Sequence, residues 1–384
     1  MILFFVWTDV QLINCVNVKC NYYSEENAEL IVYKRGRISE SLLEIVCKNR
    51  VFCNISILEL PDFFEEDRVN KMDRLSFIIA HIRLKKYLSH KVNSIIGNKR
   101  YEKLLVASFW SETLNVYKNI RKKNKNVHIE IVEEGMANYT GVEKWIYRAA
   151  PSSAMKAWLR EIFYCGYLGI EARKKVSCLY LYRPELVWAN PIKEIKKIPV
   201  IDKKNDNLFK VFDEWQEELD NSLYEEKKII FITDEPNLEE KANDMLKHLI
   251  GFMPDFMKDF LIVKPHPLHN FEEKGDIIKS KEGIWVDGRD QPVENILFRC
   301  NMKDKILVIN HSSALLYLKC MLGKEPYTIF TYRIQQSSKK GLDVRFNFFA
   351  ERLKGIFEEP DRLIIPDTME ECQKAIEEIW KKII

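Results

Sequence analysis

Three segments of this chain place polar residues directly after a short apolar run that is typical of a buried strand. The first segment, residues 127–135, ends in Glu133, Glu134 and Gly135. Because side chains alternate along a strand, the two glutamates are expected to point to opposite sides, and only one of them can face a cleft. A carboxylate there, with its pKa raised by partial burial, can take a proton from a hydroxyl group. A solvated acidic turn is the alternative interpretation.

The second segment, residues 261–267, delivers a histidine between two prolines. Pro265 and Pro267 restrict the backbone, so His266 is expected to project rigidly from the end of the strand. Such a side chain suits a general acid, which must meet one leaving-group oxygen. A loop histidine beside prolines that merely end the strand is the alternative interpretation.

The third segment, residues 306–313, is a strand pattern that ends in Ser312 and Ser313 and is followed by a helical pattern. Free backbone N–H groups at such a position can bind a phosphate group, and the serine hydroxyls add further donors. Ordinary N-capping of the helix by serine is the alternative interpretation.

The absence of several nucleotide- and metal-binding motifs limits the ligands that this chain is expected to bind. The chain contains no Gly-x-Gly-x-x-Gly, no P-loop, and no Asp-x-Asp at the end of an expected strand. A nucleotide with one phosphate therefore fits these residues better than a diphosphate, and neither a metal nor another cofactor is expected. The nine cysteines are an odd number without a Cys-x-x-Cys pair, which indicates a reducing cytoplasm and argues against structural zinc.

The elements that must position these residues alternate between short β-rich runs and longer helical patterns. This alternation is typical of parallel sheets with helical crossovers, and 384 residues are enough for two domains. We therefore predict an α/β protein with two Rossmann-like, doubly wound domains, residues 1–200 and 201–384, that face a cleft. Prolines and charges in residues 190–208 indicate a linker. Strands are expected at 1–8, 28–33, 51–58, 103–108, 127–133, 227–233, 259–264, 283–286, 305–310 and 326–330, and helices at 39–49, 69–96, 142–168, 237–250, 292–300, 313–322, 344–354 and 368–383.

The charges are divided unevenly, with a basic excess in residues 1–200 and an acidic excess in residues 201–384. A basic half suits an anionic partner. The basic runs 83–91 and 121–125 lie on helix patterns, where a solvated face is preferred, contact with an anionic membrane comes second, and no nucleic-acid partner is expected. No apolar run reaches the length of a membrane span, so a soluble or peripheral protein is expected.

The three motifs, in this order along nearly the whole chain, resemble those of the bacterial sialyltransferases. The resemblance is closest to glycosyltransferase family 52, the lipooligosaccharide sialyltransferases, whose chains often open with a strand and a Thr-x-x-Gln-Leu turn, as at Thr8–Leu12 here. The polysialyltransferases are near relatives. The resemblance implies a GT-B fold with an acceptor-side N-terminal domain and a C-terminal domain that binds the CMP-sugar. In this fold the last helix often packs back on the N-terminal domain.

The resemblance also implies roles for individual residues. Glu134 corresponds to the general base, with Glu133 as the alternative, and His266 corresponds to the general acid or phosphate stabiliser. Glu294 of the Pro292-Val293-Glu294 segment corresponds to the carboxylate that holds the ribose hydroxyls. The remaining implied contacts are Lys264, Pro265, Pro267, Thr233, Ser312 and Ser313 on the donor side, and Thr8, Gln11 and Gly135 on the acceptor side.

The function implied is that of an inverting, metal-independent sialyltransferase that uses CMP-sialic acid as a donor substrate and needs no cofactor. The expected acceptor is a sugar hydroxyl, galactose above all, on a lipooligosaccharide or capsule glycan. Alternatives are a polysialyltransferase, a transferase of another CMP-linked keto-sugar acid, a nucleotide-sugar 2-epimerase, and a non-catalytic glycan-binding protein. The expected location is the cytoplasm, with peripheral contact at the inner face of the membrane as an option, and a homodimer is left open.

Overall fold

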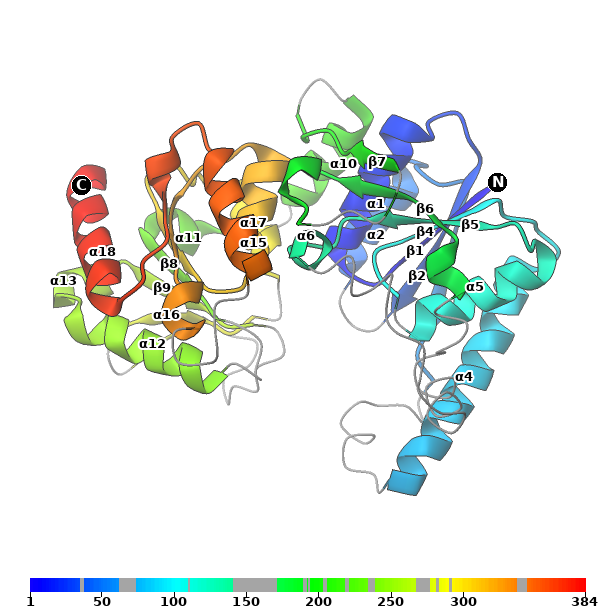
Figure 1. The fold of residues 1–384 in the computed structure, drawn as a ribbon, viewed down its shortest axis with the longest axis horizontal. Helices are drawn as coiled ribbons and strands as arrows, with labels where there is room; N and C mark the ends of the chain where they lie inside the picture. Colours follow the sequence, from blue (N-terminus) through cyan, green and yellow to red (C-terminus); the bar gives the residue numbers. More distant parts are fainter. Residues whose placement is uncertain are drawn as a thin grey trace. The chain divides into compact units, whose positions relative to one another are not determined.

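Each half of the chain forms its own seven-stranded sheet in the computed structural model (Figure 1). The chain divides into two units, Met1–Trp215 and Gln216–Ile384. The structure describes residues 1–34, 38–61, 74–109, 111–140, 171–188, 192, 194–202, 206–217, 221–233, 239–266, 277–280, 283–289, 292–336 and 344–384.

The first sheet has the strand order β3-β2-β1-β4-β5-β6-β7, and all of its pairs are parallel. Consecutive strands first add on one side of β1 and then, from β4 onward, on the other. The order therefore reverses between β1 and β4, and such a reversal opens a crevice at the carboxyl ends of the two strands. The strands are β1 Ile2–Val6, β2 Ala28–Lys34, β3 Asn54–Glu59, β4 Lys103–Val106, β5 His128–Val132, β6 Val176–Leu181 and β7 Glu194–Lys197.

Helices of the first unit connect these parallel strands. The inner strands, from β2 to β6 in the sheet order, are mainly buried, as a sheet covered by crossovers requires, and α4 contributes Leu84, Leu88 and Val92 to the same core. The helical segments are α1 Asp9–Tyr22, α2 Glu40–Lys48, α4 Arg74–Ile96, α5 Ser111–Lys123, α6 Ala137–Thr140, η1 Pro184–Leu186 and α10 Asp206–Glu217.

The second sheet has the order β10-β11-β9-β8-β12-β13-β14, and every pair is parallel except β10 with β11. Its order reverses between β8 and β12, so the second unit also has a crevice position at the carboxyl ends of two neighbouring strands. The strands are β8 Ile229–Ile232, β9 Leu261–Lys264, β10 Ile277–Lys279, β11 Trp285–Asp287, β12 Ile306–Ile309, β13 Tyr327–Phe330 and β14 Leu363–Ile364.

The last helix, α18 (Met369–Ile383), begins at Thr368, whose hydroxyl accepts a hydrogen bond from the Glu371 N–H. Its buried residues, among them Ile376 and Trp380, belong to the core of the second sheet, so its apolar face is covered within the second unit. The other helical segments here are α11 Ser222–Glu226, α12 Glu239–Phe252, α13 Asp255–Lys258, α14 Val293–Arg299, α15 Ala314–Leu316 with the π-helical turn Tyr317–Met321, α16 Tyr332–Gln336, α17 Val344–Gly355 and η4 Pro360–Arg362.

The prediction of two Rossmann-like parallel-sheet units, as in GT-B proteins, is confirmed by both strand orders. All ten expected strands are present within a few residues of their expected bounds. The linker interpretation of residues 190–208 was wrong for Glu194–Lys197, which pair with β6 as the edge strand β7. Strands β10 and β14 were also missed, because short edge strands carry little of the apolar pattern that reveals buried ones. Strand β6 was missed as well, although it lies inside the sheet and is mostly buried. The helix expected at 142–168 lies outside the described residues.

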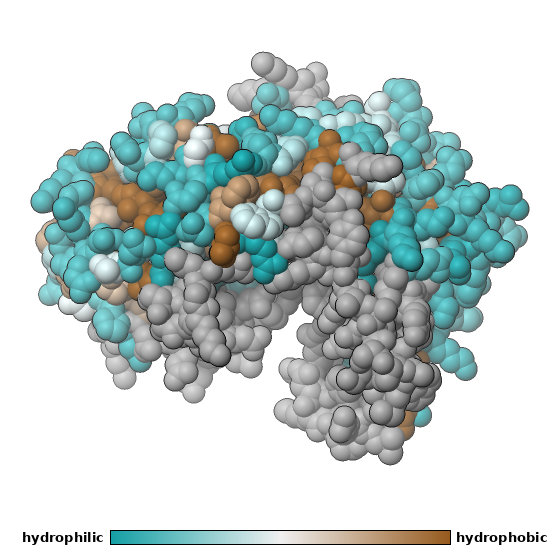
Figure 2. Space-filling view, in the orientation of Figure 1, coloured by the Kyte–Doolittle hydropathy of each residue, from teal (hydrophilic) through white to brown (hydrophobic). Residues whose placement is uncertain are grey.

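The surface of the described residues is mainly hydrophilic on the face seen in Figure 2, with a few separate hydrophobic patches. Large apolar side chains with substantial exposure include Ile79 and Ile82 on α4 and Phe256 on α13. Within the described part of the chain, every helix is too short or too polar to cross a bilayer.

Candidate functional site

The carboxyl ends of β1, β4 and β5 gather polar residues beside the point where the first strand order reverses. Thr8 follows β1, Ser108 follows β4, and Glu134 follows β5. Gln11, in the first turn of α1, joins two of these ends, because its side-chain amide donates a hydrogen bond of 2.7 Å to Glu134 Oε1. Residues 123 positions apart in the chain are thereby brought together.

Glu134 is partly buried and is held at both its main chain and its side chain. Its N–H donates to the side-chain oxygen of Asn138 at 2.7 Å, while Gln11 binds the carboxylate. Burial raises the pKa of Glu134, and the side chains of Ser108 and Gln11 act in the opposite direction. The result is an oriented carboxylate that takes up a proton more readily than a solvated glutamate, which is the property of a general base.

Glu133 points into the protein, on the other side of the strand. Its Oε2 accepts a hydrogen bond from the Tyr139 hydroxyl and one of 2.8 Å from the Tyr182 N–H, and its side chain is fully buried. Burial raises the pKa of Glu133 to about 8. The predicted opposite orientation of the two glutamates is thus present, and Glu134 is the accessible one.

Thr8 and Gln11 form the start of α1. The Thr8 hydroxyl accepts from the Gln11 N–H at 3.3 Å, and Gln11 Oε1 accepts from the Trp7 N–H at 3.0 Å. This reciprocal arrangement is close to a capping box, and it fixes the Gln11 side chain that binds Glu134. Gly135 has a φ of 137°, a conformation that other residues rarely adopt, and the chain turns there into α6.

In the second unit, His266 lies at the carboxyl end of β9, next to the end of β8. Its main-chain N–H donates to the Thr233 hydroxyl at 2.9 Å, and the Thr233 N–H donates to the Lys264 carbonyl at 3.1 Å. These contacts fix the backbone on both sides of Pro265, which is itself buried. Pro267 lies outside the described residues.

Lys264 is buried, and protein groups bind its ammonium. It donates to the carbonyls of Asp287 at 3.3 Å and Arg289 at 2.6 Å, and it lies 3.5 Å from the Asp287 carboxylate. The Arg289 guanidinium and the Tyr224 hydroxyl bind the same carboxylate. Burial alone would raise the pKa of Asp287, but the Arg289 hydrogen bond and the charge of Lys264 lower it overall. Lys264 therefore holds the β11 end of the sheet in place.

Glu294 is half-buried in the first turn of α14, which begins after Pro292. Burial raises its pKa, while its own backbone N–H and the charge of Lys264 act in the opposite direction. Its place in the first turn of α14 fits the interpretation as a helix-terminal acid, and the role as a ribose ligand stays a prediction.

Ser312 and Ser313 follow β12 and lie directly before α15, as the sequence predicted. The Ser312 hydroxyl oxygen accepts from the Ala314 N–H, the first N–H of α15, at 3.2 Å, whereas Ser313, the N-cap residue, makes no side-chain capping hydrogen bond. The helix then continues as a π-helical turn, a form that is frequent at functional sites. Because β8 lies between β9 and β12, the ends that carry His266 and Ser312 are ~10 Å apart.

Several residues of these strand ends were missed by sequence reasoning. Ser108 carried a usable signal, since it follows a buried strand run as Ser312 does. Asn138 and Asp287 carried none, because an asparagine near a turn and an aspartate after a short strand are common. Their importance comes from partners that only the fold supplies.

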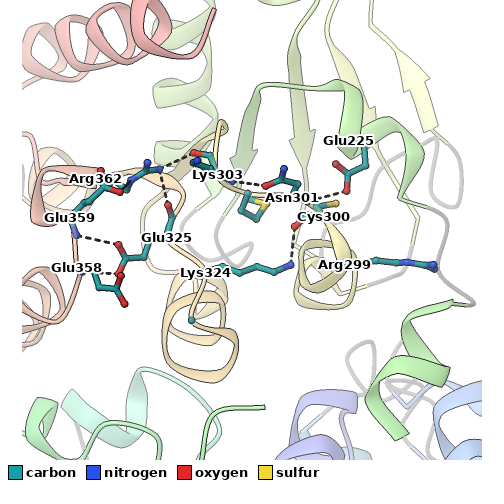
Figure 3. A pocket seen from close by; sticks show the side chains of 12 residues that line it. Glu225, Arg299, Cys300, Asn301, Lys303, Lys324, Glu325, Glu358, Glu359 and Arg362 are labelled. Atoms are coloured by element: carbon teal, nitrogen blue, oxygen red, sulfur yellow. Dashed lines mark hydrogen bonds and ion pairs between the residues drawn. The ribbon is translucent and has the colours of Figure 1, made fainter. Parts of the chain in front are cut away.

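A second charged region lies at the opposite, amino edge of the second sheet (Figure 3). This cavity of about 540 Å³ is lined by segments that precede β8, β12, β13 and β14. The Glu325 carboxylate binds Lys319 and the N–H groups of Glu358 and Glu359. The Arg362 guanidinium donates to the carbonyls of residues 303 and 325 at 2.8 and 3.1 Å.

Lys324 is another charged residue that lines this cavity. Its ammonium donates to carbonyls at the end of α14, including that of Cys300 at 2.8 Å. Burial lowers the pKa of Lys324. The charged groups of the amino-edge cavity therefore tie neighbouring loops together.

The described residues contain no group of three or more His, Cys, Asp or Glu side chains arranged to hold a metal ion.

Comparison with solved structures finds matches of low sequence identity along nearly the whole chain. The UDP-glucosyltransferase from Polygonum tinctorium matches with 10% identity and a TM-score of 0.48, over 100% of this chain and 91% of that chain. The glycotransferase of kitacinnamycin matches with 8% identity and a TM-score of 0.48, over 98% and 90%. The UDP-GlcNAc 2-epimerase from Methanocaldococcus jannaschii matches with 10% identity and a TM-score of 0.47, over 98% and 99%.

Sequence comparison gives a more specific answer. No curated protein sequence matches this chain. The family model for alpha-2,8-polysialyltransferase (POLYST), however, matches residues 2–330, which include β1, both glutamates, His266 and the two serines. This match covers most of both units, and the chain therefore belongs to the alpha-2,8-polysialyltransferase family.

Proposed function

We propose that this protein is an inverting sialyltransferase that moves a sialic acid from CMP-sialic acid to a hydroxyl group of an acceptor sugar. A sialyltransferase-type glycosyl transfer follows from the family. The donor, the stereochemistry and the roles of individual residues are our proposals. The observation that carries them is the Glu134 carboxylate, held by Gln11 at a strand end and given a raised pKa by burial.

In this proposal, Glu134 acts as the general base. The acceptor oxygen attacks the anomeric carbon of sialic acid while the bond from that carbon to the CMP phosphate breaks. The proton of the acceptor hydroxyl passes to Glu134, whose raised pKa brings its proton affinity closer to the working pH. Attack from the side opposite to the leaving phosphate inverts the configuration.

His266 acts on the departing phosphate as a general acid or a charge stabiliser. Thr233 supports this role, because its hydroxyl accepts from the main-chain N–H of His266 and so fixes the backbone that carries the imidazole. Ser312 and Ser313 bind the phosphate, Glu294 binds the ribose hydroxyls, and Lys264 holds the segment before Glu294 in place. One phosphate can be matched by these groups without a metal ion, so we propose metal-independent transfer.

The acceptor is a sugar of a bacterial surface glycan in either of two forms. Galactose of a lipooligosaccharide fits the resemblance to glycosyltransferase family 52. Sialic acid at the end of a growing chain, as in a capsule, is the second candidate, and the family match favours it. For either acceptor we propose a cytoplasmic enzyme, in line with the odd number of cysteines without a Cys-x-x-Cys pair.

The test measures CMP release from CMP-sialic acid with lactose, with a sialylated lactose, and without acceptor. Release that depends on acceptor supports the proposal, and the preferred acceptor separates single addition from chain extension. Glu134→Gln is expected to lower turnover by about 10²- to 10⁴-fold. Glu102→Gln, which changes an exposed carboxylate at the amino end of β4, serves as the matched control and is expected to retain activity. Equal activity of both variants would remove Glu134 from the mechanism.

Two further measurements test the donor and the metal. Turnover is expected to persist in EDTA, and complete loss that a divalent ion restores would contradict metal independence. CMP is expected to bind far better than UDP in calorimetric titration, because the donor pocket offers one phosphate site. Equal binding of UDP would favour a nucleotide-sugar 2-epimerase instead.

A further inference from the structure

Helix α4 (Arg74–Ile96) combines a strong positive charge with apolar side chains in solvent. Its sequence contains five Lys and Arg residues and no Asp or Glu. In Figure 1 it is the long helix of the first unit whose N-terminal end lies farthest from the strands. Such a helix has one face that packs on the protein and another that is exposed.

One face of α4 is accounted for by the core. Ala80, Leu84, Leu88, Val92 and Ile96 are buried at intervals of four residues and pack in the core of the first unit. Hydrogen bonds to α5 fix the rotation of the helix, from Asn115 to the carbonyl of residue 85 at 3.0 Å and between residues 89 and 119 at 3.2 Å. The opposite face of α4 therefore points away from the core of the first unit.

That opposite face is a single stripe of five exposed residues, Ile79, Ile82, Arg83, Lys86 and His90, which we name the outer stripe. Their spacing of three and four residues places them on one side of the helix. Ile79 is 42% exposed and Ile82 is 46% exposed. Among the residues that the structure describes, neither Arg83 nor Lys86 forms an ion pair.

Cations next to exposed aliphatic side chains match the surface of an anionic bilayer. Phosphate headgroups attract the Lys and Arg side chains, and the isoleucines can enter the boundary between headgroups and acyl chains. A nucleic acid would match the charge but not the rest of the stripe, because protein surfaces that bind single strands use aromatic rings for base stacking. The outer stripe has two isoleucines and no Phe, Tyr or Trp.

We propose that the outer stripe of α4 is a docking surface for anionic phospholipid bilayers. The contact is peripheral: the stripe lies along the bilayer surface while the opposite face of α4 stays packed on the first unit. This inference does not depend on the proposed transfer reaction, because it is argued from the charge and exposure of α4 alone.

The test is co-sedimentation of the full chain with vesicles of phosphatidylcholine, with or without about 30% phosphatidylglycerol. The wild type is expected to bind the anionic vesicles at least tenfold more tightly, with a loss of binding at high salt. The double charge reversal Arg83→Glu/Lys86→Glu is expected to weaken this binding at least tenfold. Ile79→Ser/Ile82→Ser is expected to weaken it about fivefold or more with the charge intact.

The matched control is Lys381→Glu/Lys382→Glu, which makes the same change in net charge at exposed residues of α18. It is expected to bind like the wild type, and far-ultraviolet circular dichroism checks that every variant is folded. Equal loss in the control, equal binding to neutral vesicles, or unchanged binding of Arg83→Glu/Lys86→Glu would each overturn the proposal. Binding of a single-stranded RNA that depends on Arg83 and Lys86, with vesicle binding unaffected, would identify a nucleic-acid surface instead.

Discussion

The two edges of the second sheet both gather charged and polar residues, but they use them differently. At the amino edge, Glu325, Lys324 and Arg362 direct their charged groups at neighbouring backbone and at each other. At the carboxyl edge, Lys264, Asp287 and Arg289 also bind one another, whereas Thr233 fixes the main chain of His266 by accepting from its N–H. The charged groups that bind neighbouring backbone at the amino-edge cavity thus hold loops in place.

The two adjacent glutamates of the first unit also differ in how their carboxylates are bound and exposed. Glu133 is enclosed by Tyr139 and Tyr182, whereas Glu134 is partly exposed and bound by one amide. Burial raises the pKa of both carboxyls, but only the second is accessible to a substrate. The Glu133 carboxylate stabilises the end of β5, whereas the Glu134 carboxylate lies partly exposed at that end.

The largest effect is expected from His266→Ala. Removing the proposed general acid should lower turnover by about 10²- to 10⁴-fold while the protein stays folded. His128→Ala, at an exposed position in β5, is the matched control and should keep wild-type turnover. A fully active His266→Ala enzyme would mean that the carboxyl edge is no more functional than the amino edge.

The variant Glu133→Gln tests whether the Glu133 carboxyl stabilises the fold, through the pH dependence of the free energy of unfolding. The pKa of Glu133 is about 8 in the folded protein, above its unfolded value, so the folded state retains a proton that the unfolded state loses. The free energy of unfolding of the wild type should therefore fall as pH rises from about 4.5 to about 8, by on the order of 3 to 5 kcal/mol from this group.

The Gln variant should lack this slope, because a neutral amide has no proton to lose. Urea unfolding at pH 5, 7 and 9 measures the difference between the two proteins. A difference that stays constant over this range would show that Glu133 is ionised in the folded protein.

Glu325→Gln tests the structural role of the amino edge. Loss of the charge that binds Lys319 and two backbone N–H groups should lower the free energy of unfolding by about 2 to 4 kcal/mol. The affinity for CMP should stay unchanged, as calorimetric titration can measure. Weaker CMP binding in a folded Glu325→Gln protein would turn the amino edge into a second ligand site and reverse the comparison.

The smallest effect is expected from Ser312→Ala/Ser313→Ala. Loss of both hydroxyls should weaken CMP binding by about 1 to 3 kcal/mol, the scale of hydrogen bonds to a charged group. Cytidine has no phosphate and should bind the variant as it binds the wild type. Equal weakening of both ligands would identify Ser312 as a helix cap only, in line with its bond to Ala314.

The sequence alone located the polar strand ends, because an apolar run followed by a turn is a local signal. It placed Glu134, His266 and Ser312 after strands that the structure confirms as β5, β9 and β12. The nucleotide contact that the resemblance implies for Lys264 stays a prediction, and the fold binds its ammonium to Asp287 and Arg289. A lysine at a strand end looks the same in either role, because its partners are 23 and 25 positions away.

What the sequence determined by itself is the alternation of strands and helices and the positions of the chemically capable residues along them. Only the tertiary structure decided which of these side chains bind other protein groups and how far each of them is exposed. Gln11 meets Glu134 because β1 and β5 flank β4 in one sheet, and no local pattern records that neighbourhood. Burial, and with it the pKa of a carboxyl, depends on atoms from distant segments, so it is a property of the folded chain.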